Sequence, residues 1–188
     1  QVLEFDDFVR IYFSTRVKDE SGKFISHISF VEMDKEFKTI KKISNQTIIT
    51  MGALGCYDEH GIFPFNVLRD EKKILGFIGG WSRRISVDIE TSIGLAISND
   101  GGLTFTRIGD GPVLSSTLDE PFLVGDPFVL KFNKTYHMWY IYGVRWIENP
   151  LNQIKERVYK IGHATSRDCI SWVKTNKQII EDKLNDDE

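Results

Sequence analysis

The sequence has no long hydrophobic run, few cysteines and no surplus of positive charge. No stretch approaches the roughly 18 uninterrupted apolar residues that indicate a membrane-spanning helix. The net charge is −3, so no basic surplus points to nucleic-acid binding. The two cysteines, Cys56 and Cys169, lie far apart and make no disulfide framework. We therefore expect neither a nucleic acid nor a membrane among the partners of this protein.

The absence of targeting, metal-binding and nucleotide-binding motifs bears on the cellular location of the protein and on its cofactors. The first residues lack the basic start and apolar core of a signal peptide. Together with the two separated thiols, this favours a reduced, cytoplasmic location. The sequence contains no CxxC pair, HExxH motif, GxGxxG motif or phosphate-binding loop, so we expect no metal and no cofactor. The oligomeric state is left open.

The 188 residues are 41% hydrophobic and 27% charged, which is the balance of an ordinary globular domain. Short runs rich in Ile, Val, Phe, Tyr and Trp are separated by Gly, Asp and Asn, a pattern that predicts β-strands. The runs are residues 9–14, 26–31, 74–79, 93–98, 136–142 and 159–165. Only residues 149–157 permit a helical interpretation. Because they are polar and lie between strands, we expect an inserted loop with one turn.

An internal repeat is the most informative feature. Residues 94–100 and 162–168 share Gly, Ala, Ser and Asp at alternate positions with an offset of 68, and residues 28–34 form a fainter copy. The Asp-Gly pair that ends the middle copy tolerates positive φ and predicts a tight turn between antiparallel strands. Phe105 and Trp172 follow the turn of their repeats, and we expect them to pack between neighbouring sheets.

Each repeat unit reads as four short antiparallel strands, which is typical of β-propeller blades. Three units are visible, at about residues 1–48, 56–115 and 122–182, and a fourth begins near residue 186. Three blades do not close a ring, because propellers normally have at least four. The sequence therefore predicts an all-β fold, a single propeller region over residues 1–188 that belongs to a longer propeller.

Blade geometry brings particular residues to one mouth of the ring. The starts of the innermost strands lie at the same end as the exits of the second strands. The starts carry Asp58, Glu59, His60 and Asp126, and the exits carry Arg16, Trp81, Arg83, Arg145 and Trp146. Carboxylates can accept hydrogen bonds from hydroxyl groups, and indole rings stack on sugar faces. Arginines bind hydroxyl, carboxylate or phosphate groups. The mouth therefore suits a carbohydrate.

A family resemblance rests on three segments. They are Gly125-Asp126-Pro127, the strand at residues 93–105 and the aromatic strand at residues 136–143. Together they resemble the five-bladed propellers of glycoside hydrolases, especially families 43 and 32 and their uncharacterised relatives. The resemblance covers most of the chain, although similar turns also occur in sialidases and other propellers. It implies five blades in the complete protein.

The resemblance also implies catalytic roles. Such families use a base or nucleophile in the first blade, an orienting Asp, often in a DP pair, and a general-acid Glu one blade later. Asp126 matches the orienting Asp, and Glu188 stands where the acid is expected. The first-blade acid would lie before Gln1, which is a departure from the pattern. Glycoside cleavage needs a proton donor and a second carboxylate whose separation sets the stereochemistry, which the sequence leaves open.

Each candidate also has a structural interpretation. Asp126 would cap a turn, and residues 58–60 would form a solvated loop. Both tryptophans would pack between blades, the arginines would form ion pairs, and Glu188 would belong to a frayed terminus. We expect a glycoside hydrolase-like protein that acts on a glycan or glycoside. The alternatives are a non-catalytic carbohydrate-binding or protein-interaction propeller, and a glycoside phosphorylase.

Overall fold

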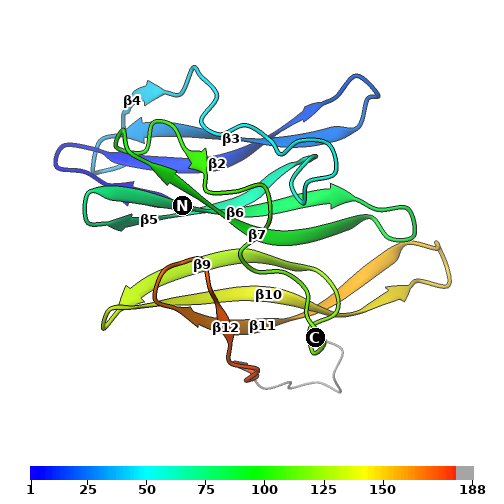
Figure 1. Ribbon diagram of the computed structural model, residues 1–188. Helices are drawn as coiled ribbons and strands as arrows, with labels where there is room; N and C mark the ends of the chain where they lie inside the picture. The colour runs from blue at the N-terminus through cyan, green and yellow to red at the C-terminus, as the bar shows by residue number, and fades with distance from the viewer. Residues whose placement is uncertain (181–188) are drawn as a thin grey trace.

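The computed structural model describes residues 1–180, which contain twelve β-strands and no helix (Figure 1). The strands fall into three groups of four, here called blades 1, 2 and 3. Blade 1 contains β1 (Val2–Glu4), β2 (Val9–Lys18), β3 (Phe24–Met33) and β4 (Ile40–Ile43). Blade 2 contains β5 (Gly61–Asp70), β6 (Lys73–Arg83), β7 (Ile89–Ser98) and β8 (Thr106–Arg107). Blade 3 contains β9 (Val124–Phe132), β10 (Thr135–Glu148), β11 (Lys155–Ser166) and β12 (Val173–Lys174).

Every blade is an antiparallel meander in which consecutive strands pair. This confirms the predicted all-β fold built from blades of four antiparallel strands. One parallel bridge between Ser26 and Gly61 also links blade 1 to blade 2. The fourth predicted unit, near residue 186, lies outside the described residues.

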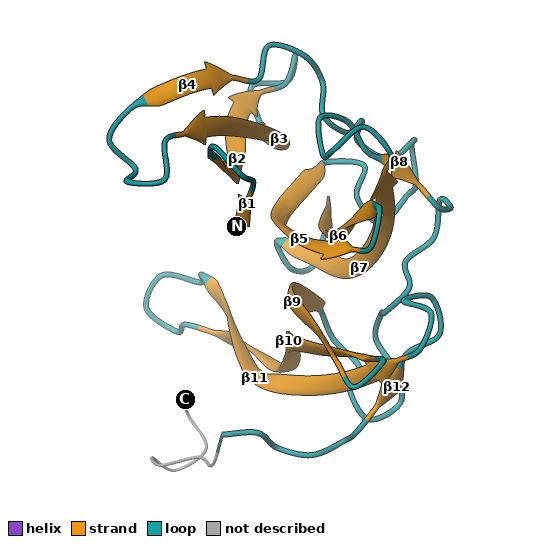
Figure 2. Ribbon diagram, turned by 90° about the vertical axis from the view of Figure 1, so that its left-hand side faces the viewer, coloured by secondary structure: helices purple, strands orange, loops and turns teal. Residues whose placement is uncertain are grey.

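The blades fan out around a common side of the molecule (Figure 2). The inner strands β1, β5 and β9 lie toward that side, and β4, β8 and β12 lie at the outer edges. Within residues 1–180 the three blades do not close a ring. The arrangement is that of part of a β-propeller.

The strands follow from side-chain alternation and from burial. In β3, buried side chains such as Ile28 and Phe30 alternate with half-buried ones, as expected for a strand with one face on the core. By contrast, β6 is buried on both faces from residue 74 to residue 80, because blade 2 is covered on either side by another blade. Small residues permit this close packing, since a Cβ on Gly76 would clash with the ring of Phe65.

Two apolar clusters fill the spaces between the blades, one between blades 1 and 2 and the other between blades 2 and 3. Phe105 belongs to the first cluster and packs edge-on against Phe65 at a ring-centroid distance of 5.0 Å. Trp172 packs against the second cluster, with its ring 6.1 Å from that of Phe77. The predicted placement of both aromatic residues between neighbouring sheets is thereby confirmed.

A side chain at the centre of the molecule joins all three blades. Asn66 on β5 is 4% exposed. Its Nδ2 donates a hydrogen bond to Oε1 of Gln1 at 3.0 Å, at the start of blade 1. Its Oδ1 accepts a hydrogen bond from the backbone N–H of Val129 at 3.2 Å, in blade 3. The inner strands are therefore tied together by polar contacts as well as by apolar packing.

The repeated Ser-x-Asp motif builds a turn. Ser98 Oγ accepts a hydrogen bond from the backbone N–H of Gly102 at 2.8 Å. The Asp100 carboxylate accepts hydrogen bonds from the backbone N–H groups of Leu103 and Thr104 and from the Thr104 hydroxyl. In blade 3, Ser166 and Asp168 hold the corresponding turn in the same way. The motif is thus a structural feature of the blade, because its side chains replace missing backbone partners.

One sequence expectation needs correction. Residues 149–157 were expected to form an inserted loop with one turn. Instead β10 and β11 form a long hairpin, and only residues 149–154 make its turn. The turn is closed by a hydrogen bond from the backbone N–H of Asn149 to the carbonyl of Ile154 at 2.9 Å. Polar residues on an exposed hairpin resemble a loop in sequence, because neither strand face there is buried.

Candidate functional site

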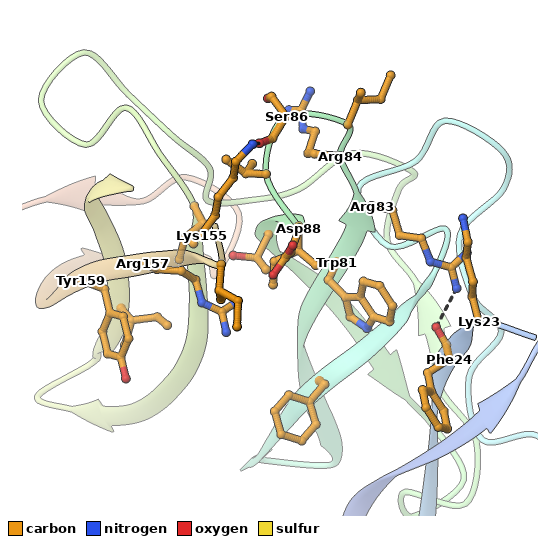
Figure 3. A pocket seen from close by; sticks show the side chains of 18 of the residues that line it. Lys23, Phe24, Trp81, Arg83, Arg84, Ser86, Asp88, Lys155, Arg157 and Tyr159 are labelled. Atoms are coloured by element: carbon orange, nitrogen blue, oxygen red, sulfur yellow. Dashed lines mark hydrogen bonds between the residues drawn. The ribbon is translucent and has the colours of Figure 1, made fainter. Parts of the chain in front are cut away.

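A pocket of about 960 Å³ opens where the second and third strands of each blade are joined (Figure 3). We call it the tip pocket. Blade 1 contributes Arg16, Lys23 and Phe24; blade 2 contributes Phe63, Trp81, residues 83–89 and Thr91; blade 3 contributes Leu123, Asp126, Ile141, residues 153–155, Arg157 and Tyr159. Its size lies in the range of small-molecule binding sites.

Asp126 reaches the tip pocket from an irregular position in β9. The pairing of β9 with β10 slips there, so that Asp126 and Pro127 together oppose the single residue Tyr140. Asp126 has a φ of 51°, which is uncommon for a residue other than glycine. Bulges of this kind re-aim side chains, and backbone strain is concentrated at functional sites. The regular pairing of β9 with β10 is thus interrupted at the position of this carboxylate.

The surroundings of Asp126 change its protonation. Asp126 is an exposed residue, yet desolvation by the surrounding protein raises the pKa of its carboxyl group. The positive charge of Arg157 acts in the opposite direction and lowers that pKa, but less strongly. A carboxyl group with a raised pKa in a pocket is a candidate functional group.

Blade 2 carries an aromatic residue at the position that corresponds to Asp126. The pairing of β5 with β6 slips in the same way, and Phe63 with Pro64 opposes the single residue Gly79. Phe63 lines the tip pocket and is 55% exposed. The bulge therefore recurs in two blades, with a carboxylate in one and an open aromatic ring in the other.

Trp81 forms a half-buried wall of the tip pocket, between the contributions of blade 1 and blade 3 (Figure 3). Its Nε1–H donates a hydrogen bond to Ser26 Oγ at 3.3 Å. The His60 ring packs against it at a centroid distance of 5.8 Å, and the Arg83 guanidinium lies 5.9 Å from its ring centroid. These contacts fix the orientation of the indole ring.

The predicted arginines of the tip pocket differ in their partners. Arg83 donates hydrogen bonds to Asp19 at 3.0 Å and to the carbonyl of Phe24 at 2.7 Å. Arg16, on β2, makes no side-chain hydrogen bond or ion pair with any described residue. It lies level with Trp81, because the strand pairs join Arg16 to Ser26, Ser26 to Gly61 and Gly61 to Trp81.

Several pocket residues were not among the predicted site residues. Lys155, Arg157 and Tyr159 occupy every second position at the start of β11, and all three line the tip pocket. Lys155 Nζ also donates a hydrogen bond to the carbonyl of Ser86 at 2.5 Å, which links the hairpin tips of blades 3 and 2. Asp88 is the second carboxylate of the tip pocket. The sequence of residues 155–159 shows no apolar alternation, so it carries no clear signal that these side chains belong to a strand.

Other predicted site residues lie outside the tip pocket. Asp58 is fully buried and forms an ion pair with Arg107 of β8, which also binds the carbonyl of Thr50. Glu59 accepts a hydrogen bond from the backbone N–H of Gly55 at 2.6 Å, and its other oxygen lies 3.2 Å from His60 Nδ1. Asp58 and Glu59 thus hold the segment before β5, and His60 supports the ring of a pocket residue.

Two predicted residues of β10 are also absent from the lining of the tip pocket. Arg145 and Trp146 follow a second bulge, at which the pairing of β10 with β11 slips between Gly143 and Arg145. Both are half-buried. Glu188, the predicted proton donor, lies outside the described residues. The structure therefore brings together Asp126, Arg16, Trp81 and Arg83 from the predicted set.

Within residues 1–180, no group of three or more His, Cys, Asp or Glu side chains is arranged to hold a metal ion. In the same residues, no helix is long and apolar enough to cross a bilayer.

Comparison with known proteins extends these observations. No family model matches the sequence. An uncharacterised protein of Mycobacterium tuberculosis is 31% identical over 181 residues, which make up 96% of this chain and 58% of that protein. A second strain of the same species has a protein with the same match. The chain thus spans 58% of the length of the curated relatives it matches.

Solved structures show the same architecture. One described as a glycoside hydrolase has a TM-score of 0.70 at 14% identity, covering 98% of this chain and 54% of that chain. A GH32 beta-fructofuranosidase of Bombyx mori has a TM-score of 0.66 at 14% identity, covering 96% and 34%. Zg3597, a family 117 glycoside hydrolase of Zobellia galactanivorans, has a TM-score of 0.63 at 12% identity, covering 92% and 43%.

This chain has a glycoside hydrolase-like fold. At these identities the likeness concerns the fold alone and carries no activity with it. In the glycoside hydrolase-like fold of this chain, the tip pocket lies between three blades rather than within one of them.

Proposed function

We propose that the protein acts on a glycan or glycoside through carboxylic acid and carboxylate catalysis, as a glycoside hydrolase-like protein. The observation that carries the proposal is Asp126, a carboxylate on a strand bulge that lines a three-blade pocket. Two aromatic side chains, Phe63 and Trp81, line the same pocket and offer surfaces on which a sugar ring can stack. The fold adds support, since glycoside hydrolases share it.

In this proposal Asp126 is the orienting carboxylate. Its negative charge, when ionised, stabilises the positive charge that develops on the sugar ring as the glycosidic bond breaks. Arg157 favours the ionised form, because its positive charge opposes the effect of desolvation. The proton donor is Glu188, and the complete protein is a five-bladed propeller related to glycoside hydrolase families 43 and 32. A base or nucleophile comes from another blade of the complete protein.

The test compares Asp126→Asn with Asp110→Asn in the full-length gene product. Asp110 is exposed and lies outside the tip pocket, so it controls for the loss of one carboxylate. The readout is product release from a panel of neutral and acidic oligosaccharides, with thermal unfolding as the check on folding. We expect Asp126→Asn to abolish turnover without unfolding the protein, whereas Asp110→Asn keeps both. Undiminished turnover in Asp126→Asn would overturn the role of this residue.

A second candidate function is carbohydrate binding without catalysis. It is favoured by Phe63, which stands in blade 2 where blade 3 has Asp126. Asp126 and Asp88 are the carboxylates that line the tip pocket within residues 1–180. Saturable binding of an oligosaccharide with no product after long incubation would favour this candidate. Product formation that requires inorganic phosphate would instead identify a glycoside phosphorylase.

A further inference from the structure

The tip pocket has the opposite charge balance from the whole chain. Its lining includes two carboxylates, Asp88 and Asp126, and six cationic side chains. The cationic side chains are Arg16, Lys23, Arg83, Arg84, Lys155 and Arg157. The complete chain, by contrast, has a net charge of −3. A concave site lined mainly by one sign of charge attracts ligands of the other sign.

Three of these cations already have partners. Arg83 binds Asp19, Arg84 binds Glu90 at 2.9 Å, and Lys155 binds a backbone carbonyl. Their charge is therefore at least partly compensated within the protein. Each of the three thus already makes at least one side-chain contact within the protein.

The other three cations have no side-chain hydrogen bond or ion pair to any residue within 1–180. Of these, Arg157 has an electrostatic role, because it lowers the pKa of Asp126. An anion bound at Arg157 would be repelled by the ionised Asp126 carboxylate, which interacts electrostatically with Arg157. Neither Arg16 nor Lys23 has a comparable electrostatic interaction with a carboxylate of the tip pocket. Within residues 1–180, the charges of Arg16 and Lys23 are therefore the ones available to bind an anionic ligand.

Arg16 and Lys23 both belong to the β2–β3 hairpin of blade 1. Arg16 pairs with Ser26, and Lys23 immediately precedes β3. Figure 3 shows Lys23 and Phe24 on the side of the tip pocket opposite Arg157, with the Trp81 ring between the two sides. A sugar that stacks on Trp81 can therefore direct one substituent toward blade 1 and another toward Asp126.

We propose that the tip pocket binds a glycan that carries an anionic substituent, a carboxylate, phosphate or sulfate, and that Arg16 and Lys23 bind this substituent. The inference rests on the proposed function for one assumption, that the ligand is a carbohydrate, and it does not require catalysis. A guanidinium group offers paired N–H donors that match a carboxylate or phosphate, and an ammonium group adds a point charge. The substituent binds on the blade 1 side, and the glycosidic bond lies toward Asp126.

The test uses the full-length protein and a glycan array with neutral, uronate-bearing, phosphorylated and sulfated members. We expect retained glycans to be anionic. For a retained uronate glycan, the matched probe is the same oligosaccharide after reduction of its carboxyl groups. Its dissociation constant should be about tenfold or more higher, because charge-assisted hydrogen bonds are lost. Binding of the anionic probe should weaken as salt is raised, since salt screens exposed charges.

Variants locate the contact. Arg16→Gln combined with Lys23→Gln should weaken binding of the anionic probe about tenfold or more and leave the neutral probe unchanged. The control combines Lys72→Gln with Arg167→Gln, which removes the same charge from exposed residues outside the tip pocket. It should leave both affinities unchanged. If the control weakens the anionic probe as much as the test variant, the effect is one of net charge and the inference fails.

Two further results would overturn the inference. One is an array on which neutral glycans bind as tightly as anionic ones, or on which no anionic glycan is retained. The other is binding of inorganic phosphate alone as tight as that of a phosphorylated sugar, because free phosphate would then be the ligand. Turnover of neutral glycans without anionic preference would be consistent with the proposed function but would contradict the inference. Binding of anionic glycans without turnover would support the inference but would contradict the proposed catalytic function.

Discussion

Arg157 on β11 counteracts the effect of burial on the carboxyl group of Asp126 on β9. Desolvation raises the pKa of Asp126, and the Arg157 charge lowers it by a smaller amount. The two residues lie on strands that flank β10 within one blade, and both line the tip pocket. Arg157 therefore widens the acidic range over which Asp126 remains ionised, although desolvation has the larger effect.

Replacing Arg157 should make Asp126 harder to ionise. In Arg157→Gln the opposing charge is lost, so the pKa of Asp126 rises further above its ordinary value. An NMR titration of the Asp126 carboxyl carbon measures this directly. On the proposed function, the acidic limb of the pH profile of kcat/KM should move to higher pH. Arg167→Gln is the control, and an unshifted titration in Arg157→Gln would contradict the electrostatic pairing.

Asp58 should matter for stability rather than for ligand binding. Its carboxylate is fully buried against Arg107, whose side chain is 12% exposed. Asp58→Asn leaves the Arg107 charge almost buried without its counter-ion, which typically destabilises a protein by about 3–5 kcal/mol. The free energy of unfolding in urea measures the effect, with Asp110→Asn as the exposed control. Lost glycan binding at unchanged stability would instead support the sequence-based assignment of Asp58 to the binding site.

The Asp100 turn predicts an acid-sensitive contribution to stability. Desolvation opposes ionisation of Asp100, but hydrogen bonds from Ser98, Thr104 and Leu103 outweigh it and lower the pKa to about 2. Because the folded pKa lies below the unfolded value, the contribution is present above about pH 4 and is lost as the pH falls toward 2.

Asp100→Ala should therefore destabilise the protein by about 1–2 kcal/mol at neutral pH, where it removes several turn hydrogen bonds. The difference in unfolding free energy between wild type and variant should shrink between pH 4 and pH 2. Urea titrations across this range provide the measurement. A difference that stays constant with pH would show that the turn does not depend on the ionised carboxylate.

A buried polar cluster anchors the loop that leads into blade 3. Tyr140 Oη donates a hydrogen bond to Glu120, with distances of 2.9 and 3.1 Å to the two carboxylate oxygens, and Lys174 forms an ion pair with the same carboxylate. Tyr140→Phe should destabilise the protein by about 1.5–3 kcal/mol, since a hydrogen bond to a charged group is lost. Thermal or urea unfolding measures it. Tyr159→Phe is the control, because Tyr159 is half exposed and should change stability by less than about 0.5 kcal/mol.

The blades were predictable because their determinants are local. Ser98 and Asp100 build a turn from neighbouring residues, and Ser166 with Asp168 repeats it. Strand alternation and turn chemistry act over a few residues, so they leave a readable pattern. The placement of Asp126 at the pocket followed from blade geometry, because the start of an inner strand must lie at one mouth of the ring.

The rest depended on contacts between distant parts of the chain. Asp58 and Glu59 stand at the start of an inner strand, just as Asp126 does, and the sequence does not distinguish them. The difference arises from Arg107, which is 49 residues away and is brought to Asp58 by the packing of β8. Arg157 was missed because its hairpin lacks a buried face. The hydrophobic pattern that identifies strands is absent there.

The central position of Asn66 has a mechanical consequence. Its side chain, which is 4% exposed, links blades 1 and 3 to blade 2 through two hydrogen bonds. At the mouth, the corresponding links are the partly buried Arg83–Asp19 pair and the Lys155–Ser86 bond, which is exposed to solvent. The inner attachment therefore acts as a fixed pivot, and the outer links are the weaker points. Thermal motion should widen the tip pocket at its rim while the two interblade cores stay closed, which gives a large ligand room to enter.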